Sequence, residues 1–166
     1  IERLADGTLK GHNTDGRGFL RSLPQSGSAI TGGNAVIIGA GGAAKAVGDI
    51  LVSSKMISHL EFRVRAPERV ARETQHQVTS LSSTWNTQSE VPVSLLIQST
   101  PVGLDARENT GNWKECCSRF AQWLPDSLEG IVAVDLIYRP ERTPFMVVAA
   151  DRGADTVSGL GMLLYQ

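Results

Sequence analysis

The stretch AVIIGAGGAA, residues 35–44, decides the fold class of this chain. It begins with a short apolar run, Ala35 to Ile38, which is typical of a central strand buried on both faces of a parallel sheet. A glycine turn follows from Gly39 to Gly42, and the small residues after it continue as a helix. A strand, a glycine turn and a helix in direct succession predict an α/β fold, with helices covering both faces of a parallel sheet.

The rest of the 166-residue chain repeats this alternation of apolar runs and helical patterns. Further strands are predicted over residues 60–64, 78–81, 93–97, 131–136 and 155–157. Helices are predicted over residues 14–23, 43–52, 68–75, part of 105–130, 142–151 and from 159 onward. Residues 24–34, rich in Gly and Ser, and the polar residues 82–92 are predicted connectors. The order of elements predicts one doubly wound parallel sheet.

Composition excludes several classes of function. The hydrophobic fraction of 41% and the charged fraction of 20% are ordinary for a globular domain. A net charge of −1 provides no field that would attract nucleic acid or an anionic membrane, so neither is an expected partner. No apolar run approaches the ~20 residues that span a bilayer. The chain begins at Ile1 with neither Met nor a targeting signal, and we expect it to be a piece of a longer chain.

The cysteines and histidines do not form a metal-binding pattern. The two cysteines are the neighbours Cys116 and Cys117, and the three histidines are far apart in the sequence. No C-x-x-C or similar ligand spacing is present, so no metal site is predicted. Adjacent cysteines rarely pair with each other, and we expect two free thiols in a reducing compartment, the cytoplasm.

The glycine turn fits the pattern G-x-G-x-x-A over residues 39–44. Gly39 permits a tight turn, Gly41 lets the backbone approach a pyrophosphate, and Ala44 allows a helix to pack closely on a strand. The helix N-terminus adds free N–H groups and a partial positive charge for phosphates. The sequence therefore predicts a Rossmann-type dinucleotide-binding domain. A Gly-rich turn that binds no ligand is the alternative.

The end of the second strand indicates which dinucleotide is bound. Enzymes that use NAD commonly place Asp or Glu there, to bind the adenosine ribose, whereas Arg suits the 2′-phosphate of NADP. Residues 62–67 read FRVRAP and contain no acid. Arg63 and Arg65 lie near the position that reads the ribose, and a guanidinium can bind phosphate through two parallel hydrogen bonds. This favours NADP, the alternative being two solvated surface arginines.

Four further segments carry a family resemblance. They are GHNTDGRGF at 11–19, STPVGL at 99–104, VDLIYRP at 134–140 with Thr143-Pro144, and GLGMLLYQ at 159–166. Together with the glycine turn they resemble, in the same order, the motifs of the shikimate and quinate dehydrogenases. The resemblance spans nearly the whole chain and matches the C-terminal NADP-binding domain of that family. It implies a single Rossmann-type domain at 25–166, preceded by a hinge and helix at 1–24, without the N-terminal substrate lobe.

The resemblance also implies a reaction: reversible hydride transfer between NADP(H) and the 3-dehydroshikimate/shikimate pair. The family uses a catalytic Lys and Asp. Asp15 matches the Asp, whereas the Lys belongs to the N-terminal lobe and no lysine of this chain matches it. Both groups are needed for proton transfer and for holding the substrate, so this chain alone is expected to be inactive.

The family's binding residues carry over to individual positions. The glycine turn would hold the pyrophosphate, Arg65 the 2′-phosphate, and Leu136, Gly159 and Met162 would lie at the nicotinamide. The implied cofactor-binding set is Gly39, Ala40, Gly41, Gly42, Ala43, Arg65, Thr100, Leu136, Gly159 and Met162. The implied substrate-binding set is Asp15, Tyr138 and Gln166.

Some residues depart from the family pattern and leave other functions open. The family's N-R-T adenosine loop reads Val64-Arg65-Ala66 here, and its Asn-Ala before Thr-Pro reads Gln98-Ser99. The altered adenosine loop favours a non-catalytic sensor that resembles the quinate-pathway repressors. Keeping Asp15 and the other substrate residues favours the enzyme. An NAD-dependent quinate dehydrogenase is a third possibility, but an acid would be expected near Arg65.

Overall fold

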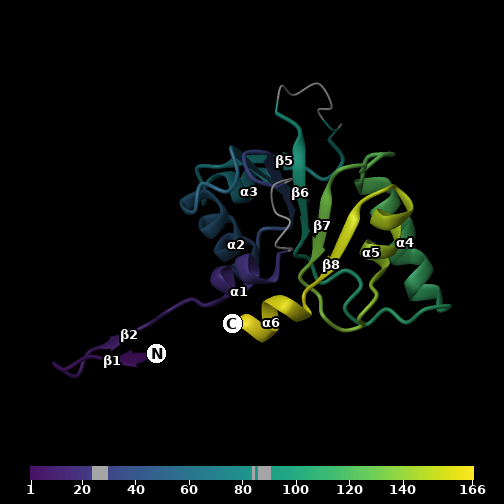
Figure 1. The fold of residues 1–166 in the computed structure, drawn as a ribbon. Coiled ribbons are helices and arrows are strands. Elements are labelled where there is room, and N and C mark those ends of the chain that lie inside the picture. Colours follow the sequence, from purple (N-terminus) through teal and green to yellow (C-terminus); the bar gives the residue numbers. More distant parts are fainter. Residues whose placement is uncertain (24–29, 84, 86–90) are drawn as a thin grey trace.

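The computed structural model describes residues 1–23, 30–83, 85 and 91–166. Its centre is a six-stranded sheet in the order β5-β4-β3-β6-β7-β8, in which every neighbouring pair is parallel (Figure 1). The strands are β3 (Asn34–Ile38), β4 (His59–Val64), β5 (Gln77–Ser80), β6 (Val93–Gln98), β7 (Val132–Asp135) and β8 (Asp155–Ser158). This confirms the predicted doubly wound parallel sheet. The predicted connectors at 24–34 and 82–92 lie partly outside the described residues.

Six helices are found in the described parts of the chain: α1 (Asp15–Ser22), α2 (Gly42–Ser53), α3 (Pro67–Ala71), α4 (Gly111–Trp123), α5 (Pro144–Asp151) and α6 (Leu160–Tyr165). The predicted helix at 68–75 is shorter than expected. Of the helices described, none is both long and apolar enough to cross a membrane.

Two hydrophobic cores lie on opposite faces of the sheet. Side chains alternate along β3, so that Ala35 and Ile37 enter one core while Val36 and Ile38 enter the other. Helices α1, α2 and α6 cover the first core, and α4 and α5 cover the second. This arrangement explains why β3 is wholly apolar: it has no face that meets water.

A small antiparallel hairpin, β1 (Glu2–Arg3) with β2 (Leu9–Lys10), was not predicted from the sequence. It projects away from the sheet, at the purple end of the chain in Figure 1. Gly7 adopts φ +88° in the turn, and Asp6 accepts hydrogen bonds from the backbone and hydroxyl of Thr8. Its residues are all exposed, so the alternation of apolar and polar residues that usually marks a strand is absent.

Candidate functional site

A groove of about 1,240 Å³ opens at the carboxyl ends of β3, β4 and β6. After β3 the chain builds β4 and β5 on one side, then returns to place β6 on the other side of β3. The connections after β3 and β6 therefore leave in opposite directions, which creates a crevice at this point of an open α/β sheet. Ligands bind in such crevices, so the groove is the candidate binding site.

The glycine turn forms the floor of this groove. Gly39 has φ +103°, and a Cβ there would lie 2.7 Å from Ser99 Oγ, so a side chain would be both strained and obstructed. At Gly41 a Cβ would meet nothing within 4 Å, because that position faces open space. Helix α2 begins at Gly42 with no side-chain cap, which leaves its first N–H groups for a ligand. The positive φ fits the tight turn predicted for Gly39, and the pyrophosphate contact predicted for Gly41 stays a prediction.

The close packing of α2 on the sheet depends on one residue that the sequence analysis did not identify. Ala44 is fully buried, as expected. A Cβ on Gly48, however, would lie 2.9 Å from Leu60 Cδ2 and 3.1 Å from Phe62 Cζ. A close helix–strand approach therefore also occurs at Gly48, one turn beyond the predicted position.

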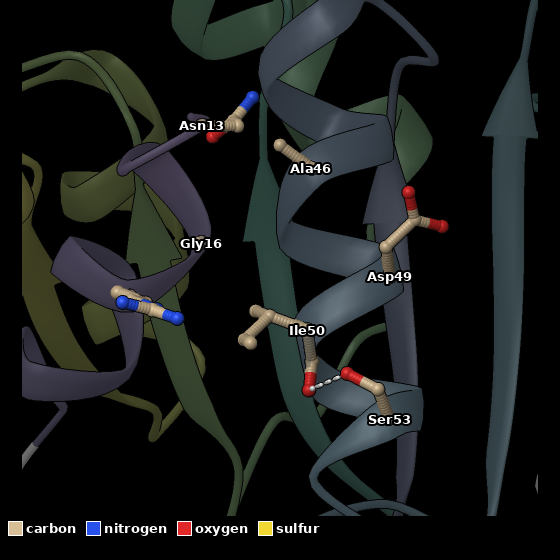
Figure 2. A pocket seen from close by; sticks show the side chains of 7 residues that line it. Asn13, Gly16, Ala46, Asp49, Ile50 and Ser53 are labelled. Carbon is tan, nitrogen blue, oxygen red and sulfur yellow. Dashed lines mark hydrogen bonds between the residues drawn. The ribbon is translucent and has the colours of Figure 1, made fainter. Parts of the chain in front are cut away.

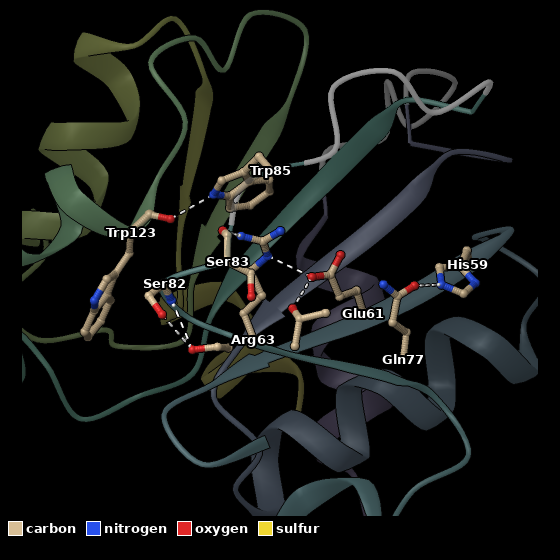
Figure 3. A network of polar contacts seen from close by, with 10 residues as sticks. His59, Glu61, Arg63, Gln77, Ser82, Ser83, Trp85 and Trp123 are labelled. Atoms are coloured by element: carbon tan, nitrogen blue, oxygen red, sulfur yellow. Dashed lines mark hydrogen bonds and ion pairs between the residues drawn. The ribbon is translucent and has the colours of Figure 1, made fainter. Parts of the chain in front are cut away.

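At the end of β4, the two predicted arginines differ in environment. Arg65 is exposed and lines the groove, and no ion pair within the described chain holds it. Arg63 is only 3% exposed and is not the solvated or freely available guanidinium that the sequence suggested. It pairs with Glu61 at 2.8 Å, donates to Ser83 O at 2.9 Å, and lies 4.0 Å above the Trp85 ring (Figure 3). Of these two arginines, Arg65 is the one placed to meet a phosphate.

A second exposed arginine lines the same part of the groove. Arg69 lies on α3, one helical turn beyond Arg65 in sequence. The sequence analysis did not name it. Its position could not be read from spacing, because Arg65 precedes the helix and only Arg69 belongs to it, so the i, i+4 rule does not apply to this pair.

Helix α4 forms the opposite wall of the groove, which the sequence analysis also missed. Trp85 Nε1 donates to Trp123 O at 2.9 Å and so joins this wall to the network around Arg63 (Figure 3). Arg119 and Glu115 pair at 2.7 Å along the helix. The α4 residues that line the groove are Asn112, Glu115, Cys116, Arg119 and Trp123.

The loop after β6, residues 99–104, lines the groove along its whole length and includes the predicted Thr100. Next to it, the carboxyl of Asp135 is fully buried at the end of β7. Asp135 Oδ2 accepts from the Thr143 hydroxyl at 2.6 Å, and Oδ1 accepts from the Ile137 N–H at 2.9 Å. Burial raises the pKa of Asp135 to about 7, although both hydrogen bonds oppose the shift. This contact accounts for the spacing of Asp and Thr in the 134–144 motif.

The 11–19 motif positions α1 between two other helices. Asn13 Oδ1 accepts from the N–H of Asp15, which starts α1 half-buried. A Cβ on Gly16 would lie 2.8 Å from Ala46 O on α2, and one on Gly18 would lie 2.7 Å from Met162 O on α6. Figure 2 shows the hollow of about 200 Å³ left where α1 meets α2. The glycines are thus required by close helix packing.

The close packing at Gly18 also places Asp15 within about one helical turn of Gln166. A Cβ there would lie 3.2 Å from Gln166 Cγ, and Asp15 precedes Gly18 by three residues on α1. Met162 is 5% exposed and packs in the core with Phe19. Two of the predicted substrate residues therefore lie where α1 packs on α6: Asp15 begins α1, and Gln166 directly follows α6.

The remaining predicted residues follow β7 and β8 at the same carboxyl edge. Leu136 and Gly159 are in contact, since a Cβ on Gly159 would lie 2.4 Å from Leu136 O. Tyr138 is 46% exposed. Neither these three nor the α1–α6 residues line the groove. In the described part of the chain, no three His, Cys, Asp or Glu side chains are grouped as metal ligands would be.

Comparison with known proteins shows which proteins the chain is similar to. No family model matches the chain. It is 35% identical to the NADP(+) shikimate dehydrogenase of Streptococcus sanguinis and 36% identical to that of Moorella thermoacetica, in both cases over 97% of this chain. A crystal structure of shikimate 5-dehydrogenase from Thermus thermophilus, in complex with NADP(H) and shikimate, matches 97% of this chain with a TM-score of 0.68 and 31% identity. The chain spans about half the length of these proteins, between 54% and 56%.

Proposed function

We propose that this chain, which belongs to the shikimate dehydrogenase family, is the nucleotide-binding part of an NADP-dependent shikimate dehydrogenase. The whole enzyme would be an oxidoreductase that acts on a CH–OH group and interconverts 3-dehydroshikimate and shikimate. The relatives are longer by nearly half their length. In this proposal the additional length supplies the substrate lobe and its catalytic Lys.

The observation that carries the proposal is the groove at the β3–β6 crevice. It combines an open Gly41, an uncapped helix N-terminus and two exposed arginines, Arg65 and Arg69, at the adenosine end. Backbone N–H groups suit a pyrophosphate, and guanidinium groups suit the 2′-phosphate that distinguishes NADP from NAD. NADP would supply the hydride acceptor. Its pyrophosphate would be held by the glycine turn, with Thr100 on the facing loop; the residues of the turn are Gly39, Ala40, Gly41, Gly42 and Ala43.

The substrate side is assigned by the family motifs and supported by packing. We assign proton transfer to Asp15, whose backbone N–H is held by Asn13 at the start of α1, within about a turn of Gln166. Tyr138, exposed after β7, would contact substrate together with Gln166. Leu136, Gly159 and Met162 would border the nicotinamide, and Met162 would do so from a buried position.

Cys116 and Cys117 are both free thiols, which supports a reducing location, the cytoplasm.

One observation supports a second candidate, a sensor that binds ligand without turnover. Arg65 stands between Val64 and Ala66, which cannot supply the polar side chains of the family's adenosine loop. Such a loop is expected to hold NADP less firmly. Measured affinity and turnover separate the two candidates.

The decisive test is cofactor binding followed by activity. We expect the 166-residue chain to bind NADPH more tightly than NADH in calorimetry and to form no NADPH from NADP and shikimate. Fusing the N-terminal part of the Streptococcus sanguinis relative to the chain should restore NADPH formation, and Asp15→Asn in that fusion should remove most of it. A fusion that folds and binds both ligands without turnover would favour the sensor. Robust turnover by the chain alone would refute the assignment of the missing Lys.

A further inference from the structure

We propose that Gln98 and Asp135 are positioning residues that hold the groove loop, residues 99–104, in the shape that binds nucleotide. The inference rests on the proposed function, because it concerns affinity at the same groove. It assigns a task to two buried polar side chains that do not line the groove themselves.

The first step in the argument is how Gln98 holds the loop. Its side chain is fully buried at the end of β6. Gln98 Oε1 accepts from the N–H of Thr100, while Nε2 donates to Thr100 O at 3.0 Å and to Val102 O at 3.2 Å. One side chain therefore satisfies three backbone groups of a loop whose other face lines the groove.

The second step is the connection from Gln98 to the rest of the fold. Gln98 Nε2 also lies 3.4 Å from Asp135 Oδ1, so its two N–H groups are shared among three acceptors; the Asp135 carboxyl further accepts from Ile137 N–H and the Thr143 hydroxyl. Thr143 in turn caps α5 by accepting from Met146 N–H at 3.2 Å. The loop is thus fixed, through an unbroken chain of buried polar groups, to β7 and to the start of α5.

The charge of Asp135 decides how well this chain of hydrogen bonds is satisfied. All three of its partners are donors, so the carboxylate matches them and the protonated acid does not. Its neighbours in register are Gln98 on β6 and Ser158 on β8, and its partner from α5 is Thr143, none of which is charged. Burial raises the pKa of Asp135 to about 7, so the two states interchange near neutral pH.

The test is NADPH binding by calorimetry between about pH 6 and about pH 8, with NADH as a second probe. NADH lacks the 2′-phosphate, which itself titrates near pH 6. We expect the wild-type dissociation constant for both probes to fall as pH rises through about 7. In the isosteric Asp135→Asn variant, the NADH constant should be independent of pH, and at high pH it should exceed the wild-type value by about tenfold.

A second readout does not depend on any ligand. Amide exchange at Thr100 and Val102 should be faster in Asp135→Asn, and faster still in Gln98→Met, while exchange in the β3 core is unchanged. Gln77→Met, which removes an exposed glutamine outside the groove, is the matched control and should alter neither readout.

The outcomes distinguish this inference from the proposed function. Normal, pH-dependent NADH binding in Asp135→Asn, with unchanged exchange in the loop, would overturn the positioning role and leave the proposed function intact. A wild-type chain that binds neither NADPH nor NADH would overturn both.

Discussion

Replacing Arg65 by Ala should weaken the binding of NADPH and leave that of NADH nearly unchanged. A hydrogen bond to a charged group is worth about 1.5–3 kcal/mol, or roughly 10- to 150-fold in affinity. Arg65 is exposed, so solvent screens its charge, and Arg69 on the same wall stays in place. We therefore expect the lower end, about tenfold. Arg63 cannot take over, because Glu61, Ser83 and Trp85 already hold its guanidinium.

The double variant Arg65→Ala/Arg69→Ala should approach a loss of roughly 100-fold for NADPH, since no other exposed guanidinium from β4 or α3 lines this end of the groove in the described chain. Calorimetry with both cofactors, at low and at physiological salt, measures these losses. Arg21→Ala is the control: it removes the same charge from α1, outside the groove, and should change affinity less than about twofold. Equal losses for NADPH and NADH in Arg65→Ala would show that Arg65 does not read the 2′-phosphate.

Three further outcomes are expected. Gly41→Val should abolish binding of both cofactors in calorimetry while the thermal midpoint stays unchanged, because the side chain would enter open groove space; retained affinity would mean that the turn binds no pyrophosphate. Gly18→Val should lower the free energy of unfolding in urea by about 1–3 kcal/mol, because the new side chain would meet Met162 on α6. Gly11→Val is the control and should not lower it, because nothing lies within 4 Å of a Cβ there. Equal effects of the two variants would contradict the packing argument. Burial raises the pKa of Asp135 from 3.8 to about 7, so between these pH values the folded chain keeps a proton on Asp135 that the unfolded chain loses. The contribution of Asp135 to the free energy of unfolding therefore falls by up to about 4 kcal/mol as pH rises from about 4 to about 7. Asp135→Asn should remove that fall, so that its stability relative to wild type increases over this range in pH-dependent urea unfolding; a difference independent of pH would place the pKa elsewhere.

The predicted core elements were accurate because their signals are local. The apolar run of β3, the glycine turn and the small residues of α2 are contiguous, and each specifies backbone geometry by its own side chains. The hairpin β1–β2 escaped prediction because none of its residues is buried. Helix α3 ended early for a related reason: beyond Ala71 the residues that the sequence placed in the helix are not buried.

The sequence by itself determined the α/β class, the dinucleotide-type turn and the resemblance to a dehydrogenase family, since motif order and spacing are properties of the chain. It did not determine which arginine is available. Arg63 and Arg65 have similar sequence surroundings, yet only the tertiary structure buries Arg63 against Glu61 and Trp85. The same holds for the α4 wall of the groove and for the buried carboxyl of Asp135. The availability of a charged group and its pKa depend on partners distant in sequence and on exclusion of water, and folding alone brings these together.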